Sequence, residues 1–158
     1  MTPKALALPD YESLAEVRYQ IRRFLHFSER AARAGGLEPH HHQLMLALKG
    51  LPQNVRPLVG ELAERLQIQP HSTVELVNRL AAKGYVNRQH GAKDRREVLL
   101  SLTPKGEKIL KELSLHHRAE LRMQGPALIA ALRRAIESRQ RGNGAKAECA
   151  TRSHRRKI

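Results

Sequence analysis

Apolar side chains recur every three or four positions along most of this chain, a spacing that predicts amphipathic helices. In the first half, the pattern predicts four helices, over residues 11–34, 39–48, 58–66 and 71–83. Each is followed by a glycine or a proline, at Gly35, Gly50, Pro70 and Gly84, and these residue types end helices. On the fourth helix, the side chains expected to be buried are Val74, Val77, Leu80 and Ala81.

The apolar period changes to two after Gly84, which predicts β-strands. Residues 86–90 and 96–102 are expected to form the two strands of a hairpin, joined by a turn over residues 91–95. Val98, Leu100 and Leu102 fall on one face of the second strand. A two-stranded hairpin at this place follows directly on the pair of short helices.

A second helical region begins after the hairpin. Thr103 followed by Pro104 is typical of a helix start, because threonine caps the first turn and proline lacks an N–H that would have no partner there. Gly125-Pro126 interrupts the pattern, so we expect one helix over residues 104–123 and another over residues 126–138. The fold class is therefore mainly α, with six helices and a two-stranded hairpin that form a winged helix-turn-helix, an α+β module.

The charge of the chain indicates a polyanionic partner. Its 158 residues, a length typical of one domain, carry 29 Lys and Arg against 15 Asp and Glu, a formal net charge of +14. Nucleic acid is the first candidate partner and an anionic membrane surface the second. Residues 139–158 are strongly basic and lack apolar periodicity, so we expect a disordered tail that either solubilises the chain or acts as a non-specific DNA-binding arm.

Several other classes of protein are not expected. The longest apolar run, Ala127 to Leu132, is far shorter than the roughly 20 residues of a membrane span. The first residues, with one lysine, a short apolar patch and then acids, do not predict a secretory signal. The single cysteine, Cys149, suits a reducing cytosol. No nucleophile stands beside a base in a known motif and no glycine-rich phosphate loop occurs, so neither catalysis nor a cofactor is expected.

Two motifs in order resemble those of the MarR family of bacterial transcriptional regulators. The first is Gly-Glu-Leu-Ala-Glu-Arg-Leu at residues 60–66, with Ser72-Thr73-Val74 opening the next helix. The second is residues 94–106, which match D-x-R-x-x-x-L-x-L-T-x-x-G at each fixed position. Between them, Leu80-x-x-x-Gly84-Tyr85-Val86-x-Arg88 leads into the hairpin. The resemblance is sharp over residues 37–106 and looser over the flanking helices.

The resemblance implies a cytoplasmic, nucleoid-associated homodimer that binds a pseudo-palindromic operator in double-stranded DNA. It also implies repression of transcription that a small-molecule ligand relieves. Independently, the first and last helices carry more apolar surface than one small lobe needs. We therefore expect an N-terminal dimerisation helix, a winged helix-turn-helix domain, C-terminal dimerisation helices and a basic tail, over residues 1–36, 37–103, 104–138 and 139–158.

A recognition helix enters the major groove by its N-terminal turns, so polar side chains there are the candidate DNA contacts. Glutamine and asparagine suit adenine edges, histidine suits guanine, and serine and threonine suit phosphate oxygens. The candidates on this helix are Gln69, His71, Ser72, Thr73, Asn78 and Arg79. Glu75 is a weaker candidate, because a carboxylate repels phosphate.

The hairpin, or wing, carries a second group of candidate DNA contacts. An arginine in a narrow minor groove is stabilised by its concentrated negative potential. The wing candidates are Arg88, Lys93, Asp94, Arg95 and Arg96. The resemblance makes Arg96 the minor-groove arginine and Asp94 the residue that shapes the tip, by an ion pair or a turn cap. Lys93 and Arg88 are expected to contact phosphates.

Histidines cluster at His40-His41-His42 and His116-His117. Zinc is not expected at either cluster, because three consecutive helical side chains point in three directions and a helical ligand pair needs i, i+4 spacing. His42 and His117 could still meet across a helix interface. They are therefore candidates for a ligand pocket, or for polar residues satisfied by a neighbour.

Three alternative functions stay open at this point. An architectural protein would bind DNA by charge alone, through the wing and the tail, and would lack sequence preference. A metal-responsive regulator would use the histidines. An RNA-binding protein is disfavoured, because only 3% of the residues are aromatic and readers of single-stranded RNA stack bases on aromatic side chains.

Overall fold

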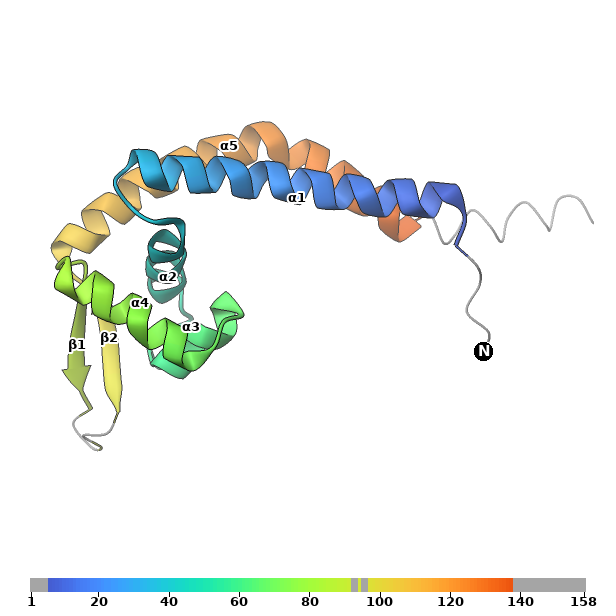
Figure 1. Cartoon of the computed structure of the whole chain (residues 1–158). Helices are drawn as coiled ribbons and strands as arrows, with labels where there is room; N and C mark the ends of the chain where they lie inside the picture. The colour runs from blue at the N-terminus through green and yellow to red at the C-terminus, as the bar shows by residue number, and fades with distance from the viewer. Residues whose placement is uncertain (1–5, 92–93, 95–96, 138–158) are drawn as a thin grey trace, which may run out of the picture. The chain divides into compact units, whose positions relative to one another are not determined.

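A computed structural model describes residues 6–91, 94 and 97–137 of the chain. The described residues form five helices and one hairpin (Figure 1). In chain order the elements are α1 (Leu8–Ala34), α2 (Pro39–Lys49), α3 (Val59–Leu66), α4 (Pro70–Ala82), β1 (Val86–His90), β2 (Val98–Leu102) and α5 (Pro104–Glu137). The order confirms the predicted mainly helical fold with a winged helix-turn-helix.

The chain divides into two compact units. The central unit, Phe27–Arg118, contains the end of α1, all of α2, α3, α4 and the hairpin, and the first part of α5. The terminal-helix unit lies outside that range, and its described residues belong to the remaining parts of α1 and α5 and to the short stretch before α1. The helix-turn-helix and the wing therefore share one unit.

The core of the central unit comes from the apolar stripes of its helices. Helix α2 packs against both α3 and α4, which also contact each other. The buried side chains that join them, each with at most 2% of its surface exposed, include Leu37, Leu44, Met45, Leu62, Val77, Leu80 and Leu100. Burial of such stripes is the main favourable contribution to folding, so the apolar periodicity of the sequence accounts for this arrangement.

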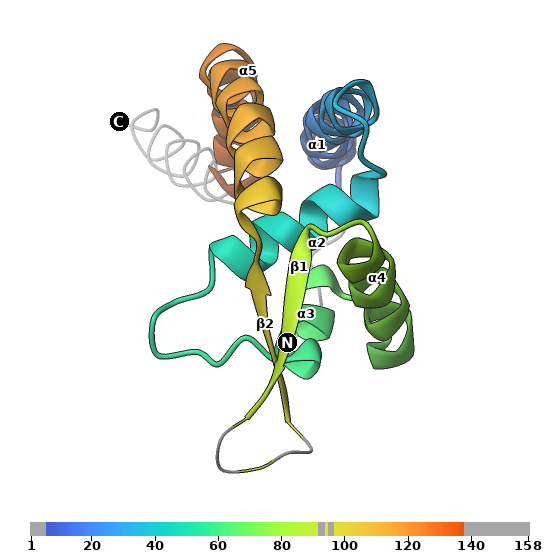
Figure 2. The ribbon, with the colours of Figure 1, turned by 90° about the vertical axis from the view of Figure 1, so that its left-hand side faces the viewer.

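The two strands form an antiparallel hairpin that extends beyond the helices of the central unit (Figure 2). Its register runs from Val86 opposite Leu102 to His90 opposite Val98. Strand β1 has the predicted bounds, whereas β2 begins at Val98, so Glu97 lies outside the strand in which it was predicted. The physical reason lies in the turn, where the N–H of Glu97 donates to the carbonyl of Asp94 at 3.1 Å.

Helix α5 is continuous from Pro104 to Glu137, with Pro126 inside it. The prediction of two closing helices, and with it of six helices in all, is therefore wrong. Proline removes one N–H donor and crowds the carbonyl of the preceding turn. The helix extends for several turns on both sides of Pro126, so the many remaining hydrogen bonds outweigh the one that is lost.

The start of α5 is fixed to the turn between α4 and β1. The hydroxyl of Thr103 accepts a hydrogen bond from the N–H of Gly106 at 3.0 Å, which confirms the predicted helix cap. The same hydroxyl donates to the carbonyl of Gly84 at 2.7 Å. Gly84 has a φ of +73°, a conformation that favours glycine. One threonine thus joins the cap of α5 to the turn that follows α4.

The terminal-helix unit exposes many large apolar side chains. Those at least 41% exposed include Leu14, Tyr19, Ile21, Leu121, Ile129, Leu132 and Ile136. A surface this apolar is typical of an interface. Across the described ranges, no helix combines the length and the apolarity that crossing a bilayer requires.

Candidate nucleic-acid interface

A tight turn between α3 and α4 sets the start of the candidate recognition helix. Gln67 ends α3 in the left-handed conformation, with φ 54° and ψ 41°, and its Nε2 donates to the carbonyl of Glu64 at 2.7 Å. Pro70 then occupies the first turn of α4, where a missing N–H costs nothing. A left-handed residue at a helix end redirects the chain sharply, so α4 begins soon after α3 ends, as in other helix-turn-helix motifs.

Helix α4 buries one face and exposes the other. Thr73, Val77 and Leu80 are at most 1% exposed and form the buried face. The exposed side chains of α4 and of the residue before it include Gln69, His71, Val74, Glu75, Asn78 and Arg79, and Ser72 is half-buried. Five of the predicted contacts on this helix are therefore accessible to a partner, at least in part.

The structure corrects two residues of this helix. Thr73 cannot present its side chain to DNA, because it is fully buried and its hydroxyl donates to the carbonyl of Gln69 at 3.3 Å. Val74, expected in the core, is instead 39% exposed. The buried stripe of α4 includes Thr73, because its methyl group can pack as a methyl group of valine does. Val74, the next residue, therefore lies on the outer face of the helix. An exposed methyl-bearing side chain suits the C5-methyl group of thymine.

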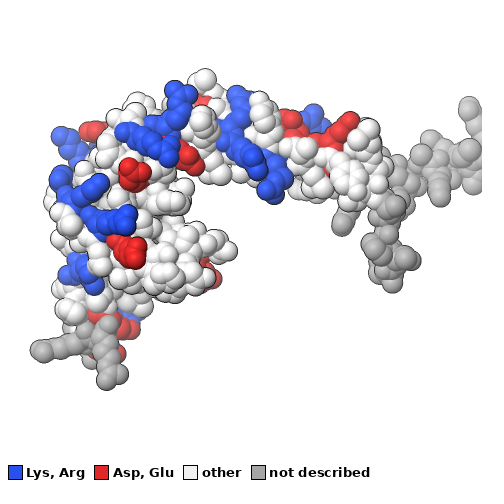
Figure 3. Space-filling model, in the orientation of Figure 1, with Lys and Arg blue, Asp and Glu red and all other residues white. Residues whose placement is uncertain are grey.

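Helix α4 is joined to the wing by a polar contact. On β1, Nη1 of Arg88 donates to Oδ1 of Asn78 at 2.5 Å. Arg79 lies 3.9 Å from Glu75 on the same helix, an exposed pair that contributes little to stability. Lys and Arg side chains gather over the end of α4 and the adjoining strand (Figure 3). Exposed cations of α4, its C-cap and β1 include Arg79, Lys83 and Arg88.

The tip of the wing is only partly described. The candidates Lys93, Arg95 and Arg96 lie outside the described residues. Asp94 is exposed, and its carbonyl accepts the N–H of Glu97 at 3.1 Å. The main chain of Asp94 therefore takes part in the turn.

Arg56, which was not among the candidates predicted from the sequence, holds the turn end of the wing. Its guanidinium donates two hydrogen bonds to the carboxylate of Glu97, at 2.7 and 2.5 Å, and these bonds raise the pKa of Arg56 above its ordinary value. Next to it, the carbonyl of Pro57 accepts the N–H of Leu100 at 2.9 Å. The loop before α3 thus extends the hairpin at its β2 edge. No local spacing reveals a pair 41 positions apart.

His42 and His117 do meet across a helix interface, as the sequence allowed. Their rings stack with centroids 4.6 Å apart, and both side chains are buried. Nδ1 of His117 donates to the carbonyl of Leu113 at 2.6 Å, and its Nε2 lies 2.7 Å from the hydroxyl of Ser28. Neither ring nitrogen of His42 has a hydrogen-bond partner among the described residues. Burial, followed by the proximity of His117, lowers the pKa of His42 to about 4.

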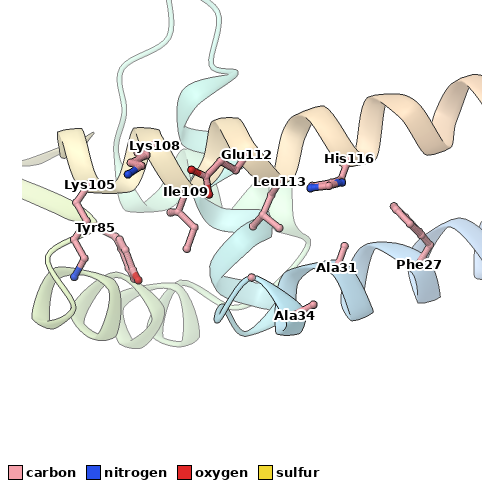
Figure 4. Close-up of a pocket in the computed structure, with 11 residues that line it drawn as sticks. Phe27, Ala31, Ala34, Tyr85, Lys105, Lys108, Ile109, Glu112, Leu113 and His116 are labelled. Atoms are coloured by element: carbon pink, nitrogen blue, oxygen red, sulfur yellow. The ribbon is translucent and has the colours of Figure 1, made fainter.

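A cavity of about 500 Å³ lies elsewhere in the central unit (Figure 4). Its lining comes from α1, from α5, and from Gly35 and Tyr85, and includes His116 but neither His42 nor His117. His42 and His117 do not line this cavity, because their stacked rings are buried between helices, so their role in a ligand pocket stays a prediction. Within the ranges that the structure describes, no group of three or more His, Cys, Asp or Glu side chains is placed to hold a metal ion.

Comparison with known proteins identifies relatives of this arrangement. The model of the MarR family matches residues 35–97. The HTH-type transcriptional repressor MdtR of Bacillus subtilis is 32% identical over 75 residues. That match covers 48% of this chain and 48% of MdtR, so the chain spans about half the length of this curated relative.

Solved structures share the fold. AbsC, a MarR family transcriptional regulator from Streptomyces coelicolor, superposes with a TM-score of 0.68 at 18% identity, covering 94% of this chain and 99% of AbsC. A mutant of MepR from S. aureus, bound to an oligodeoxyribonucleotide, has a TM-score of 0.57 at 16% identity, covering 89% of this chain and 97% of MepR. At these identities the likeness concerns the fold alone.

Proposed function

We propose, from the match of residues 35–97 to the model of the MarR family, that the chain is a regulator of this family and represses transcription by binding a specific site in double-stranded DNA. The observation that carries the proposal is the exposed face of α4. It presents His71, Val74, Asn78 and Arg79 to a partner, on the second helix of a helix-turn-helix. That helix is the one that enters the major groove in such motifs.

Each exposed side chain has a chemical role in this proposal. Asn78 suits an adenine edge and His71 a guanine edge, while Val74 contacts a thymine methyl group. Arg79 and Arg88 are cations at the end of this face and suit phosphates. Arg96, which lies with Arg95 outside the described residues, is proposed as the minor-groove arginine, because an arginine gains there from the concentrated negative potential.

The proposal includes a homodimer. The terminal-helix unit exposes large apolar side chains on both of its helices, among them Leu14 at 51%, Ile129 at 52% and Ile136 at 72%. Two copies that bury these surfaces would present two recognition helices to a pseudo-palindromic operator, about 34–36 Å apart, or one turn of B-DNA. The proposal also includes release by a small molecule, for which the cavity of about 500 Å³ in the central unit offers a site.

Replacement of Asn78 by alanine tests this function. The wild-type protein would first be used to select DNA fragments from the source genome. Fluorescence anisotropy would then measure the affinity of each protein for a selected fragment and for a scrambled copy of it. Asn78→Ala is expected to weaken binding to the selected fragment by about tenfold or more, because a base contact is worth roughly 1–3 kcal/mol. Binding to the scrambled copy should change much less, because no charge is lost and the only other effect is that Arg88 loses its hydrogen bond to Asn78.

The matched control is His26→Ala, an exposed polar side chain on α1, which should leave both affinities at their wild-type values. An Asn78→Ala protein that keeps full affinity for the selected fragment would refute the assignment of α4 as the reading helix.

A further inference from the structure

The side chains of Asn78 and Arg88 project from backbone that the core of the central unit holds in place. On α4, Asn78 follows Val77, which is 1% exposed, and the nearby Leu80 is fully buried. On the hairpin, Arg88 lies opposite Leu100, which is buried and whose N–H donates to the loop before α3. Strand β1 contacts α4 (Figure 2). The two exposed side chains therefore start from fixed points.

The hydrogen bond between these side chains fixes the orientation of the Asn78 amide. A guanidinium has N–H donors and no acceptor, so the atom of Asn78 that lies 2.5 Å from Nη1 of Arg88 must be the oxygen, Oδ1. An exposed asparagine without such a partner can turn its amide over and present either group. With Oδ1 bound to Arg88, the Nδ2 group and the second lone pair of Oδ1 are left for a partner.

An amide fixed in this way matches the edge of adenine. In the major groove, adenine presents N7 as an acceptor and its N6 amino group as a donor. Nδ2 of Asn78 can donate to N7 while the second lone pair of Oδ1 accepts from N6. The positive charge of Arg88 on Oδ1 polarises the amide and makes its N–H groups better donors. An amide that is oriented before DNA binds also loses less conformational freedom on binding.

We propose that Arg88 is a positioning residue for base recognition, which holds the amide of Asn78 in the orientation that reads an adenine edge. A phosphate contact by Arg88 is compatible with this role, because only one N–H group of the guanidinium bonds to Asn78 and the others can donate to an anion. The base contact rests on the proposed function, whereas the ordering of the amide in the free protein does not.

NMR relaxation of side-chain amide nitrogens tests the ordering in the protein without DNA. The Nδ2 group of Asn78 should be ordered in the wild type and mobile in Arg88→Met, because methionine keeps an unbranched side chain and removes the donor. Asn87, an exposed asparagine beside Arg88 on β1, is the internal reference and should be mobile in both proteins. A wild-type Asn78 amide as mobile as that of Asn87, or order that survives in Arg88→Met, would overturn the proposal.

Single-base-pair variants of a selected DNA fragment test the effect on recognition. Asn78→Ala should identify the base pair that Asn78 reads, because substitution of that pair then no longer changes the affinity. Arg88→Met should reduce the discrimination of the wild type at the same pair by about threefold to tenfold and should leave discrimination at the other pairs unchanged. If Arg88 acts through Asn78, the double variant should discriminate at that pair as Asn78→Ala does.

Arg79→Met is the matched control, because it removes an equal charge from the exposed face of α4. It should weaken binding to all the duplexes by the same factor, as loss of a phosphate contact does, without a change in discrimination. Should Arg88→Met behave in the same way, Arg88 would contact phosphate alone and the proposal would be wrong. Absence of any sequence preference in the wild type would contradict the proposed function and its base contact, and the relaxation measurement would still decide whether Arg88 orders the amide.

Discussion

Replacement of Gly106 by alanine is expected to destabilise the protein by about 3 kcal/mol or more, a loss typical of severe steric conflict in a core. A Cβ at this position would overlap the carbonyl oxygen of Tyr85 and lie 3.1 Å from its carbonyl carbon. That carbonyl cannot move easily, because it accepts a hydrogen bond from the N–H of Thr103 at 3.0 Å. The N–H of Tyr85 also donates to the carbonyl of Leu80 at 2.9 Å, which fixes the same residue from its other side. The start of α5 would therefore have to separate from the turn after α4.

Gly60→Ala is the matched control for that substitution. Gly60 lies in α3, and a Cβ there would meet nothing within 4 Å. Alanine should raise the stability by about 0.5–1 kcal/mol, because glycine loses more conformational freedom in a helix. Urea unfolding followed by circular dichroism would measure both variants. A Gly106→Ala protein with the midpoint of the wild type would contradict the close contact between α5 and Tyr85.

Acidification is expected to remove about 3 kcal/mol of stability through His42 alone, between its ordinary pKa of 6.5 and its folded-state pKa of about 4. In that interval the unfolded chain binds a proton at this imidazole and the folded chain does not. The contribution is therefore complete above pH 6.5 and is lost as the pH falls to about 4. His41 acts in the same direction, because burial, followed by the charge of Lys83, lowers its pKa.

His42→Phe isolates the contribution of His42 to this pH dependence. Phenylalanine keeps the ring and removes two buried nitrogens that have no partner in the described structure, so stability near pH 7 should be equal or higher. The part of the acid sensitivity that belongs to His42 should disappear. His40→Gln, at an exposed position on the same helix, should unfold like the wild type at each pH. Equal acid sensitivity in His42→Phe and wild type would show that His42 is not buried in its neutral form.

Local signals in the sequence account for most of the fold. Gly35 and Gly84 follow the predicted ends of α1 and α4, and the alternation after Gly84 placed β1 correctly. Pro126 led us to predict a break where α5 is continuous. A proline in the sequence does not show how many hydrogen bonds on either side of it sustain a long helix. Val74 was predicted to be buried and Thr73 to be exposed, and the structure shows the reverse. The reason is that threonine can bury its methyl group while its hydroxyl bonds to the backbone of the preceding turn.

Contacts between segments that are distant in the sequence could not be predicted, for a different reason. The pairing of Arg56 with Glu97 joins a loop to the turn end of the wing, and the bond from Lys105 to the carbonyl of Lys83 joins two helix ends. Neither pair has a characteristic spacing, and a backbone carbonyl has no signature in the sequence. Such contacts become visible only once the packing of α2, α3 and α4 has brought the segments together.

Competition binding at one fixed salt concentration tests the central claim most directly. A labelled fragment selected from the source genome would be displaced from the wild-type protein by unlabelled copies of itself and of a scrambled duplex. If the exposed face of α4 reads base edges, the selected sequence should be preferred by about 10³-fold or more. Equal displacement by both duplexes would mean that the positive charge alone holds the DNA, and the assignment of a sequence-specific regulator would be wrong.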